Sequence, residues 1–285
     1  MASIKLKGDT SGEVTISAPA VAGTTTLELP ATSSTLATQN ALGVRNLIIN
    51  GDMRIAQRGT SQTGLTNGSN GYYTVDRWKF QEAGAPTYAV TMSQDTDVPT
   101  GQGFSNSVKY DITTAQSSLA AADGLLMPQI IEGQMLQHIK KGTSSAESLT
   151  LSFWVKSNKT GTYIFELEDA DNARNISKSY TIDAVDTWEK KTITIDADTT
   201  GTLDNDNNAS FKCWFWFAAG SNYTSGTLAT SWASVTTANR AVGQVNLADS
   251  TSNYINITGV QLEIGSATPF EHRPYDMELA RCQRY

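Results

Sequence analysis

Leu149-Thr150-Leu151-Ser152-Phe153-Trp154-Val155-Lys156 alternates apolar and polar residues with a period of two. Successive side chains of a β-strand point to opposite faces, so the four apolar residues at odd positions share one face. Trp154 falls on the other face with threonine, serine and lysine. This pattern predicts a strand with one face on a core, as is typical of antiparallel sheets.

Other segments repeat the same alternation, and they lie on both sides of this stretch: Tyr163–Leu167, Thr192–Ile195, Phe211–Phe217 and Tyr254–Ile264. In the last of these the apolar phase shifts by one residue after Gly259, which predicts a β-bulge. Short strands, Asn/Asp/Gly turns and one-sided burial together predict an all-β fold, an antiparallel β-sandwich over residues 43–272. Residues 273–285 are expected to form a tail with a short helix at Met277–Arg284, for which Asp276 is a candidate N-cap.

Residues 1–42 have the alternation of strands but no aromatic residue, since the first of the chain is Tyr72. Their few aliphatic side chains cannot offset the entropy of ordering the backbone. We therefore expect an extended β stem that is either disordered or stabilised by other chains. Its candidate oligomerisation residues are Ile4, Leu6, Val14, Ile16, Leu27 and Leu29.

The composition limits the functional classes. The 285 residues are 39% hydrophobic and 17% charged, with a formal net charge of −7. That acidic balance and the lack of a basic run argue against nucleic acid as a ligand. No apolar run is long enough for a membrane span, and the first twenty residues do not look like a secretory signal. Cys213 and Cys282 do not suggest a disulfide framework, and both are expected to be buried or idle thiols.

Several segments resemble known families. Asn46–Met53, Thr150–Lys156 and Ile257–Gly265 resemble jelly-roll carbohydrate-binding modules. The chain from Gly23 to Tyr285 also resembles a domain of bacteriophage tail-fibre proteins, notably those of cyanophages and other marine phages. The segments that carry this second resemblance are Gly23–Ala31, the three above, Pro269–Tyr275 and Leu279–Tyr285.

The resemblance implies a jelly roll in a structural virion protein, made in the host cytoplasm and assembled as a homotrimer. Its N-terminal segment would attach to other tail or capsid proteins, and the assembly would take part in host attachment. The alternative is a carbohydrate-binding module that recognises a host surface glycan as the receptor. A capsid-attached fibre or decoration protein is a weaker alternative.

Two acidic features of the sequence bear on catalysis and metal binding. Glu166 and Glu168 share one strand face, and paired carboxylates can run glycoside hydrolysis. A solvated strand face explains them better, so no enzyme is predicted. The carbohydrate-binding modules also often carry a structural calcium near their first and last strands, where Asp52 and Glu263 fall. The acidic pair usual in the last strand is replaced here by Thr258-Gly259, which weakens the expectation of calcium.

The tryptophans are the candidate contact residues. If Phe153 and Phe215 point inward, then Trp154, Trp214 and Trp216 point outward among polar neighbours. Such a surface suits stacking of sugar rings. The same residues would also suit burial by a loop, by the C-terminal tail or by a neighbouring subunit. The sequence leaves these uses open.

Overall fold

The computed structural model describes residues 3–7, 13–17 and 45–284, and the chain divides into two units, Met1–Leu42 and Gly43–Tyr285. In the first unit, β1 (Ser3–Lys7) pairs antiparallel with β2 (Glu13–Ser17). This register places Ile4 opposite Ile16 and Leu6 opposite Val14. The other two candidate stem residues, Leu27 and Leu29, lie outside the described residues. Oligomerisation through this segment stays a prediction.

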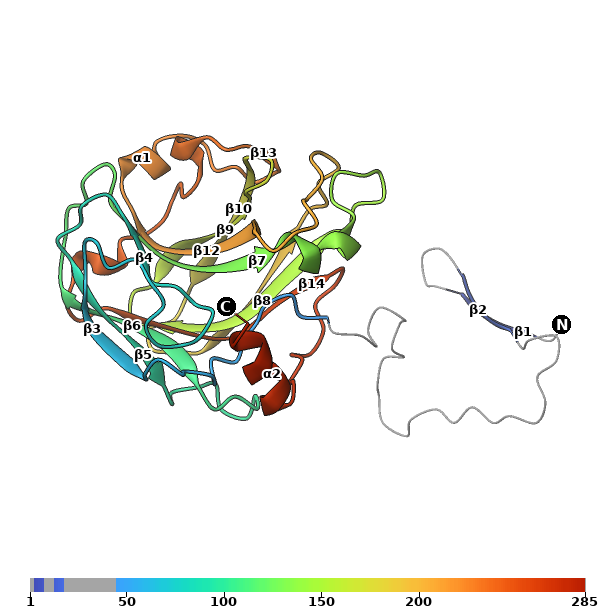
Figure 1. Cartoon of the computed structure of the whole chain (residues 1–285), viewed down its shortest axis with the longest axis horizontal. Helices are drawn as coiled ribbons and strands as arrows, with labels where there is room; N and C mark the ends of the chain where they lie inside the picture. The colour runs from blue at the N-terminus through green and yellow to red at the C-terminus, as the bar shows by residue number, and fades with distance from the viewer. Residues whose placement is uncertain (1–2, 8–12, 18–44, 285) are drawn as a thin grey trace. The chain divides into compact units, whose positions relative to one another are not determined.

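The second unit is a β-sandwich, which confirms the predicted fold class (Figure 1). Within residues 45–284 it has two antiparallel sheets of six strands each. The first, called the β12 sheet below, runs in the order β13 (Ala233–Ser234), β10 (Arg174–Ile182), β9 (Gly161–Asp169), β12 (Ala209–Ala219), β7 (Gly124–Glu132) and β4 (Gln81–Ala83). The second, called the β8 sheet, runs β11 (Glu189–Ile195), β8 (Leu149–Ser157), β14 (Tyr254–Ile264), β6 (Ser107–Thr114), β5 (Ala89–Asp95) and β3 (Ser61–Leu65).

The core lies between the two sheets and is rich in aromatic side chains. Phe153 of the β8 sheet meets Phe215 of the β12 sheet edge to face, with ring centroids 5.2 Å apart. Phe165 and Trp78 pack on the same Phe215 ring at 5.1 and 6.0 Å. Such pairs contribute roughly 0.5–1.5 kcal/mol each beyond area burial. The inward phase predicted for the β8, β9 and β12 segments is therefore confirmed.

The predicted bulge in β14 is also confirmed. Register with β8 shifts between the pairs Thr258–Trp154 and Gln261–Ser152. Gly259 at the bulge has a φ of +63°. A Cβ there would lie 2.6 Å from the Phe104 ring, so both conformation and space require glycine.

Helices are short. Besides α1 (Ser221–Thr224) and α2 (Tyr275–Cys282), residues 45–284 contain four 3-10 turns, η2 (Gly133–Met135), η3 (Gln137–Ile139), η4 (Thr237–Asn239) and η5 (Leu247–Asp249). The C-terminal helix exists as predicted but begins earlier, with Pro274 as N-cap and Asp276 in its first turn. An acidic residue there interacts favourably with the helix dipole. In the described part of the chain no helix is long and apolar enough to cross a membrane.

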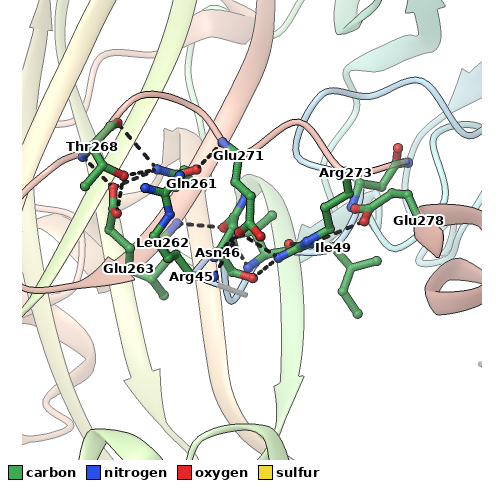
Figure 2. Close-up of polar contacts among 12 residues, drawn as sticks. Arg45, Asn46, Ile49, Gln261, Leu262, Glu263, Thr268, Glu271, Arg273 and Glu278 are labelled. Carbon is green, nitrogen blue, oxygen red and sulfur yellow. Dashed lines mark hydrogen bonds and ion pairs between the residues drawn. The ribbon is translucent and has the colours of Figure 1, made fainter. Parts of the chain in front are cut away.

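The C-terminal segment is hydrogen-bonded to the first residues of the sandwich (Figure 2). The Glu271 carboxylate accepts hydrogen bonds from the backbone N–H groups of Arg45 (2.9 Å) and Asn46 (2.7 Å). The buried Arg273 guanidinium donates to the carbonyl of Asn46 and pairs with Glu278 of α2 at 3.2 Å. Asn46–Met53 and Pro269–Tyr275, two of the segments that resemble known families, are therefore in contact. The C-terminal tail belongs to the same unit as the sandwich.

Candidate functional site

The three outward tryptophans lie on two different sheets. Trp154 belongs to β8, whereas Trp214 and Trp216 belong to β12. Each points away from the core that its neighbour Phe153 or Phe215 enters. Because the outer faces of a sandwich look in opposite directions, Trp154 does not share a surface with the other two. The prediction of one platform that includes Trp154 together with Trp214 and Trp216 is therefore wrong.

Trp216 is covered rather than exposed. Only 1% of its surface is accessible, and its ring packs on Tyr223 with centroids 5.1 Å apart. Leu126 and Ile164 of the same sheet face join it in a small apolar cluster with Ala241. Tyr223 and Ala241 come from residues 220–245, called the cover segment. This segment carries α1 over the outer side of the β12 sheet and also supplies β13, the edge strand of the same sheet (Figure 1). Of the uses left open for Trp216, burial by a loop is the one that the structure has.

Beneath the cover segment lies a buried carboxylate, Glu166, whose accessible surface is 0%. Its Oε1 accepts hydrogen bonds from Arg240 Nε (2.8 Å) and Asn175 Nδ2 (2.9 Å). Its Oε2 accepts one from the indole Nε1 of Trp216 (2.9 Å). The expectation that this carboxylate lies on a solvated strand face is wrong, because the cover segment excludes water and supplies Arg240.

Glu168, two residues further along β9, is half-buried and is held in a parallel way. It accepts hydrogen bonds from Lys212 Nζ (2.8 Å), Trp214 Nε1 (3.0 Å) and Arg240 Nη2 (2.8 Å). Arg240 therefore bridges the two carboxylates, and each glutamate anchors one tryptophan of β12. We call these six residues the Glu–Trp network: Glu166, Glu168, Lys212, Trp214, Trp216 and Arg240.

The electrostatics of the network favour a structural role over proton transfer. Burial raises the pKa of Glu166, while the adjacent Arg240 and the Trp216 N–H act in the opposite direction. The two carboxylates raise the pKa of Arg240 in spite of its burial. All four carboxylate oxygens already accept hydrogen bonds from protein groups. The carboxylates of Glu166 and Glu168 are thus both held by hydrogen bonds from the protein itself.

Trp214 sits at the margin of the cover segment and is half-buried. Its indole edge is fixed by Glu168. Two cations lie over its ring, with Arg240 Cζ at 5.7 Å and Lys212 Nζ at 6.0 Å from the centroid. A partly exposed indole that cannot rotate freely and is flanked by charged groups is suited to contact a ligand or a second protein.

Trp154 has different surroundings on the β8 sheet. It is half-buried, and two residues on Lys156 donates a hydrogen bond to Asp97 at 2.7 Å. The other oxygen of Asp97 accepts one from Trp188 Nε1 at 2.9 Å. The Asp97 side chain keeps 42% of its surface. Asp97 and Trp154 are thus partly accessible to solvent, whereas Glu166 and Trp216 of the Glu–Trp network are buried.

Two of these partners were not identified from the sequence. Arg240 and Asp97 lie in segments without strand or helix periodicity, and their partners are far away along the chain, 74 residues for Arg240 and Glu166. The sequence offered only an indirect signal for such a partner. A glutamate on an outer strand face beside a tryptophan needs a cation nearby if another segment buries it.

Asp52 and Glu263, the two residues considered for calcium, are each engaged by neighbouring protein groups. Asp52 pairs with Arg54 at 3.0 Å. The Glu263 carboxylate accepts hydrogen bonds from the Thr268 hydroxyl (2.6 Å) and from Gln261 Nε2 (2.7 Å). Residues 45–284, together with the two described strands before them, contain no group of three His, Cys, Asp or Glu that could hold a metal.

Cys213 and Cys282 are both free and buried, as predicted. Burial raises the pKa of both thiols, that of Cys282 to about 12. Neither is a reactive thiolate at neutral pH.

No protein-family model and no curated protein sequence matches the chain. Solved structures do match, at low identity. The active domain of tailspike protein 4 from bacteriophage CBA120 has a TM-score of 0.41 at 16% identity over 77% of this chain and 21% of its own. A protein from Bacteroides thetaiotaomicron named as a "putative sugar binding protein" has a TM-score of 0.43 at 13% identity, over 78% of this chain and 100% of its own. The carbohydrate-binding module TmCBM61, solved with β-1,4-galactotriose, has a TM-score of 0.38 at 9% identity with the same coverage. The chain thus spans about a fifth of the tailspike and the full length of the two sugar-binding structures.

Proposed function

We propose that the sandwich is a non-catalytic recognition module that binds a saccharide at Trp214. The observation that carries this proposal is the state of that side chain, which is partly exposed, anchored by Glu168 and flanked by Lys212 and Arg240. The fixed indole offers an apolar face for the C–H groups of a sugar ring. Lys212 offers N–H donors to hydroxyl groups beside it.

The rigidity of this residue matters for affinity. A side chain already immobilised in the free protein loses little conformational entropy when a ligand binds. Even a pair of aromatic rings contributes only roughly 0.5–1.5 kcal/mol beyond area burial. A site with a single indole is therefore expected to bind a sugar weakly. Several copies on one particle would raise the overall affinity through avidity.

We infer that the module belongs to a structural virion protein, a phage tail fibre or similar appendage. The division into two units supports this, because the first unit supplies paired strands that are separate from the sandwich. In this proposal residues 1–42 join three copies and attach them to other tail or capsid proteins, and the sandwich takes part in host attachment.

A second use of the same surface is a contact between subunits. The half-burial of Trp214 favours it as well, because aromatic residues are enriched at protein interfaces. In that case Trp214 would contribute to the oligomer and not to adsorption to the host.

A comparison of two variants separates these uses. Trp214→Ala should remove the glycan-array signal of the full chain and leave its mass in light scattering unchanged. Trp154→Ala, on the opposite sheet, is the matched control and should retain the signal. If Trp214→Ala lowers the oligomer mass and keeps the glycan signal, the subunit contact is the function of this surface. If the unaltered chain binds no glycan on the array, saccharide recognition is rejected.

A further inference from the structure

One lysine is buried at the end of the sandwich and surrounded by oxygen atoms. Lys141 Nζ lies 2.5 Å from Asp169 Oδ2 and 3.0 Å from Asp198 Oδ2. It also lies 2.8 Å from the carbonyl of Thr200 and 2.9 Å from that of Gly201. The side chains of Lys141, Asp169 and Asp198 are 3%, 0% and 4% exposed. The three residues come from the β7–β8 connection, the end of β9 and the β11–β12 connection.

The number of donors does not match the number of acceptors. A protonated lysine has three N–H groups, and four oxygens lie within 3.0 Å of this nitrogen. A neutral amine with two N–H groups would satisfy the carbonyls of Thr200 and Gly201. Transfer of the third proton to the adjacent Asp198 would free a lone pair beside Asp169, whose Oδ2 is the closest of the four oxygens to Nζ.

We propose that Lys141 and Asp169 condense into an intramolecular amide that cross-links the two segments. Asp198 accepts one proton from the ammonium group, and the free Nζ attacks Cγ of Asp169. A second proton leaves the nitrogen as the amide forms, and one N–H remains. The two released protons depart with one Asp169 oxygen as water, so no oxidant or other reactant is needed.

The neighbouring groups fit this chemistry. Asn172 donates hydrogen bonds to the Asp169 carboxylate from its backbone N–H (3.1 Å) and from Nδ2 (2.9 Å to Oδ2). Donors placed in this way stabilise the negative oxygen of a tetrahedral intermediate. Arg174 holds Asp198 with two hydrogen bonds of 2.9 and 3.1 Å. Burial opposes ionisation of Asp198, but the hydrogen bonds from Arg174 and Lys141 outweigh it and lower its pKa, so Asp198 is a carboxylate with an oxygen beside Nζ that can accept a proton.

The three side chains are also almost completely buried, and the site is balanced in charge. The Trp232 ring covers Lys141 with Nζ 5.3 Å from its centroid. A cavity of about 10 Å³, close to the size of one water molecule, is lined by both Lys141 and Asp198. Before the reaction two carboxylates face one ammonium and the Arg174 guanidinium. Afterwards Asp198 and Arg174 remain as a pair, so the reaction leaves no unpaired buried charge.

Intact-mass spectrometry of the full chain tests the proposal directly. The unaltered protein should be lighter than its sequence by one water molecule. A tryptic digest should contain a branched peptide that joins the segment of Lys141 to that of Asp169, with no cleavage after Lys141. Lys141→Arg should show the full sequence mass. Asp169→Asn should lose ammonia instead of water, because the leaving group changes. Asp198→Asn, which keeps the shape and removes the base, should slow the loss in a time course after synthesis.

One side reaction gives the same mass change. Asp123 precedes Gly124, and a succinimide at such a pair also loses one water. Hydroxylamine cleaves the backbone at a succinimide and leaves a side-chain amide intact, so conversion of the lighter species into fragments that separate between Asp123 and Gly124 overturns the proposal. It is equally overturned if the unaltered chain retains its full mass after prolonged incubation at neutral pH, in which case the contact is an ion pair only.

Discussion

The two outer faces of the sandwich have similar sequence patterns but different environments. On the β12 sheet, Trp216 and Glu166 are buried beneath residues 220–245, where both Trp216 and Arg240 donate hydrogen bonds to the Glu166 carboxylate. On the β8 sheet, Trp154 is half-buried and the nearby ion pair of Lys156 with Asp97 is open to solvent on one side. The cover segment therefore buries the outer face of the β12 sheet and creates a second buried region, which contains ion pairs. The comparison can be tested by four experiments.

The largest difference is expected for the tryptophans. Trp216→Ala should lower the free energy of unfolding by about 4 kcal/mol, because it leaves a cavity and removes a donor from the buried Glu166. Trp154→Ala should cost clearly less, since part of that side chain is already in water. Urea unfolding of both variants measures the difference. Equal costs would contradict the contrast between a covered and an open face.

The ion pairs should differ next. Arg240→Ala removes the cation shared by two carboxylates, one of which is fully buried, and should cost about 3 kcal/mol. Lys156→Ala breaks a partly exposed pair and should cost at most about 1 kcal/mol. Adding Glu166→Gln to Arg240→Ala should recover part of the loss, because the unpaired charge is then gone. If the double variant is no more stable than Arg240→Ala, the cost does not come from a buried charge.

The pH dependence should have opposite signs on the two faces. Burial raises the pKa of Glu166 above its usual 4.5, so its contribution is complete at low pH and is lost as the pH rises. The unaltered protein should therefore lose stability relative to Glu166→Gln above about pH 4.5. Burial opposes ionisation of Asp97 as well, but hydrogen bonds from Lys156 and Trp188 lower its pKa below 3.8. Relative to Asp97→Asn, stability should be lost as the pH falls below that value, by a small amount because Asp97 is partly exposed.

Titration of stability at fixed temperature checks both slopes. The same sign for the two pairs of proteins would mean that the environments of the two carboxylates are alike.

The smallest effect on the stability of the sandwich is expected from deletion of residues 1–42. A protein that begins at Gly43 should unfold cooperatively with the same midpoint as the full chain, because both faces belong to the unit Gly43–Tyr285. Light scattering should at the same time show loss of the oligomer if residues 1–42 join the copies. An insoluble or unstructured product would show that the sandwich depends on the first unit.

The sequence alone determined five strands of the sandwich, β8, β9, β11, β12 and β14, together with their inward and outward phases and the bulge at Gly259. These features follow from backbone geometry within a few residues, since a period of two assigns each side chain to a face. They correctly placed Phe153 and Phe215 inside and the three candidate tryptophans outside.

Only the tertiary structure decided what each outward face meets. Strand phase cannot tell which sheet a strand joins, so the placement of Trp154 and Trp214 on opposite sheets was not predictable from it. Residues 220–245 have no regular period that would reveal them as a cover, and Arg240 reaches Glu166 across 74 residues of chain. Lys141, Asp169 and Asp198 likewise meet only because three separate connections close one end of the sandwich. Contacts of this kind depend on the path of the whole backbone, which local patterns do not encode.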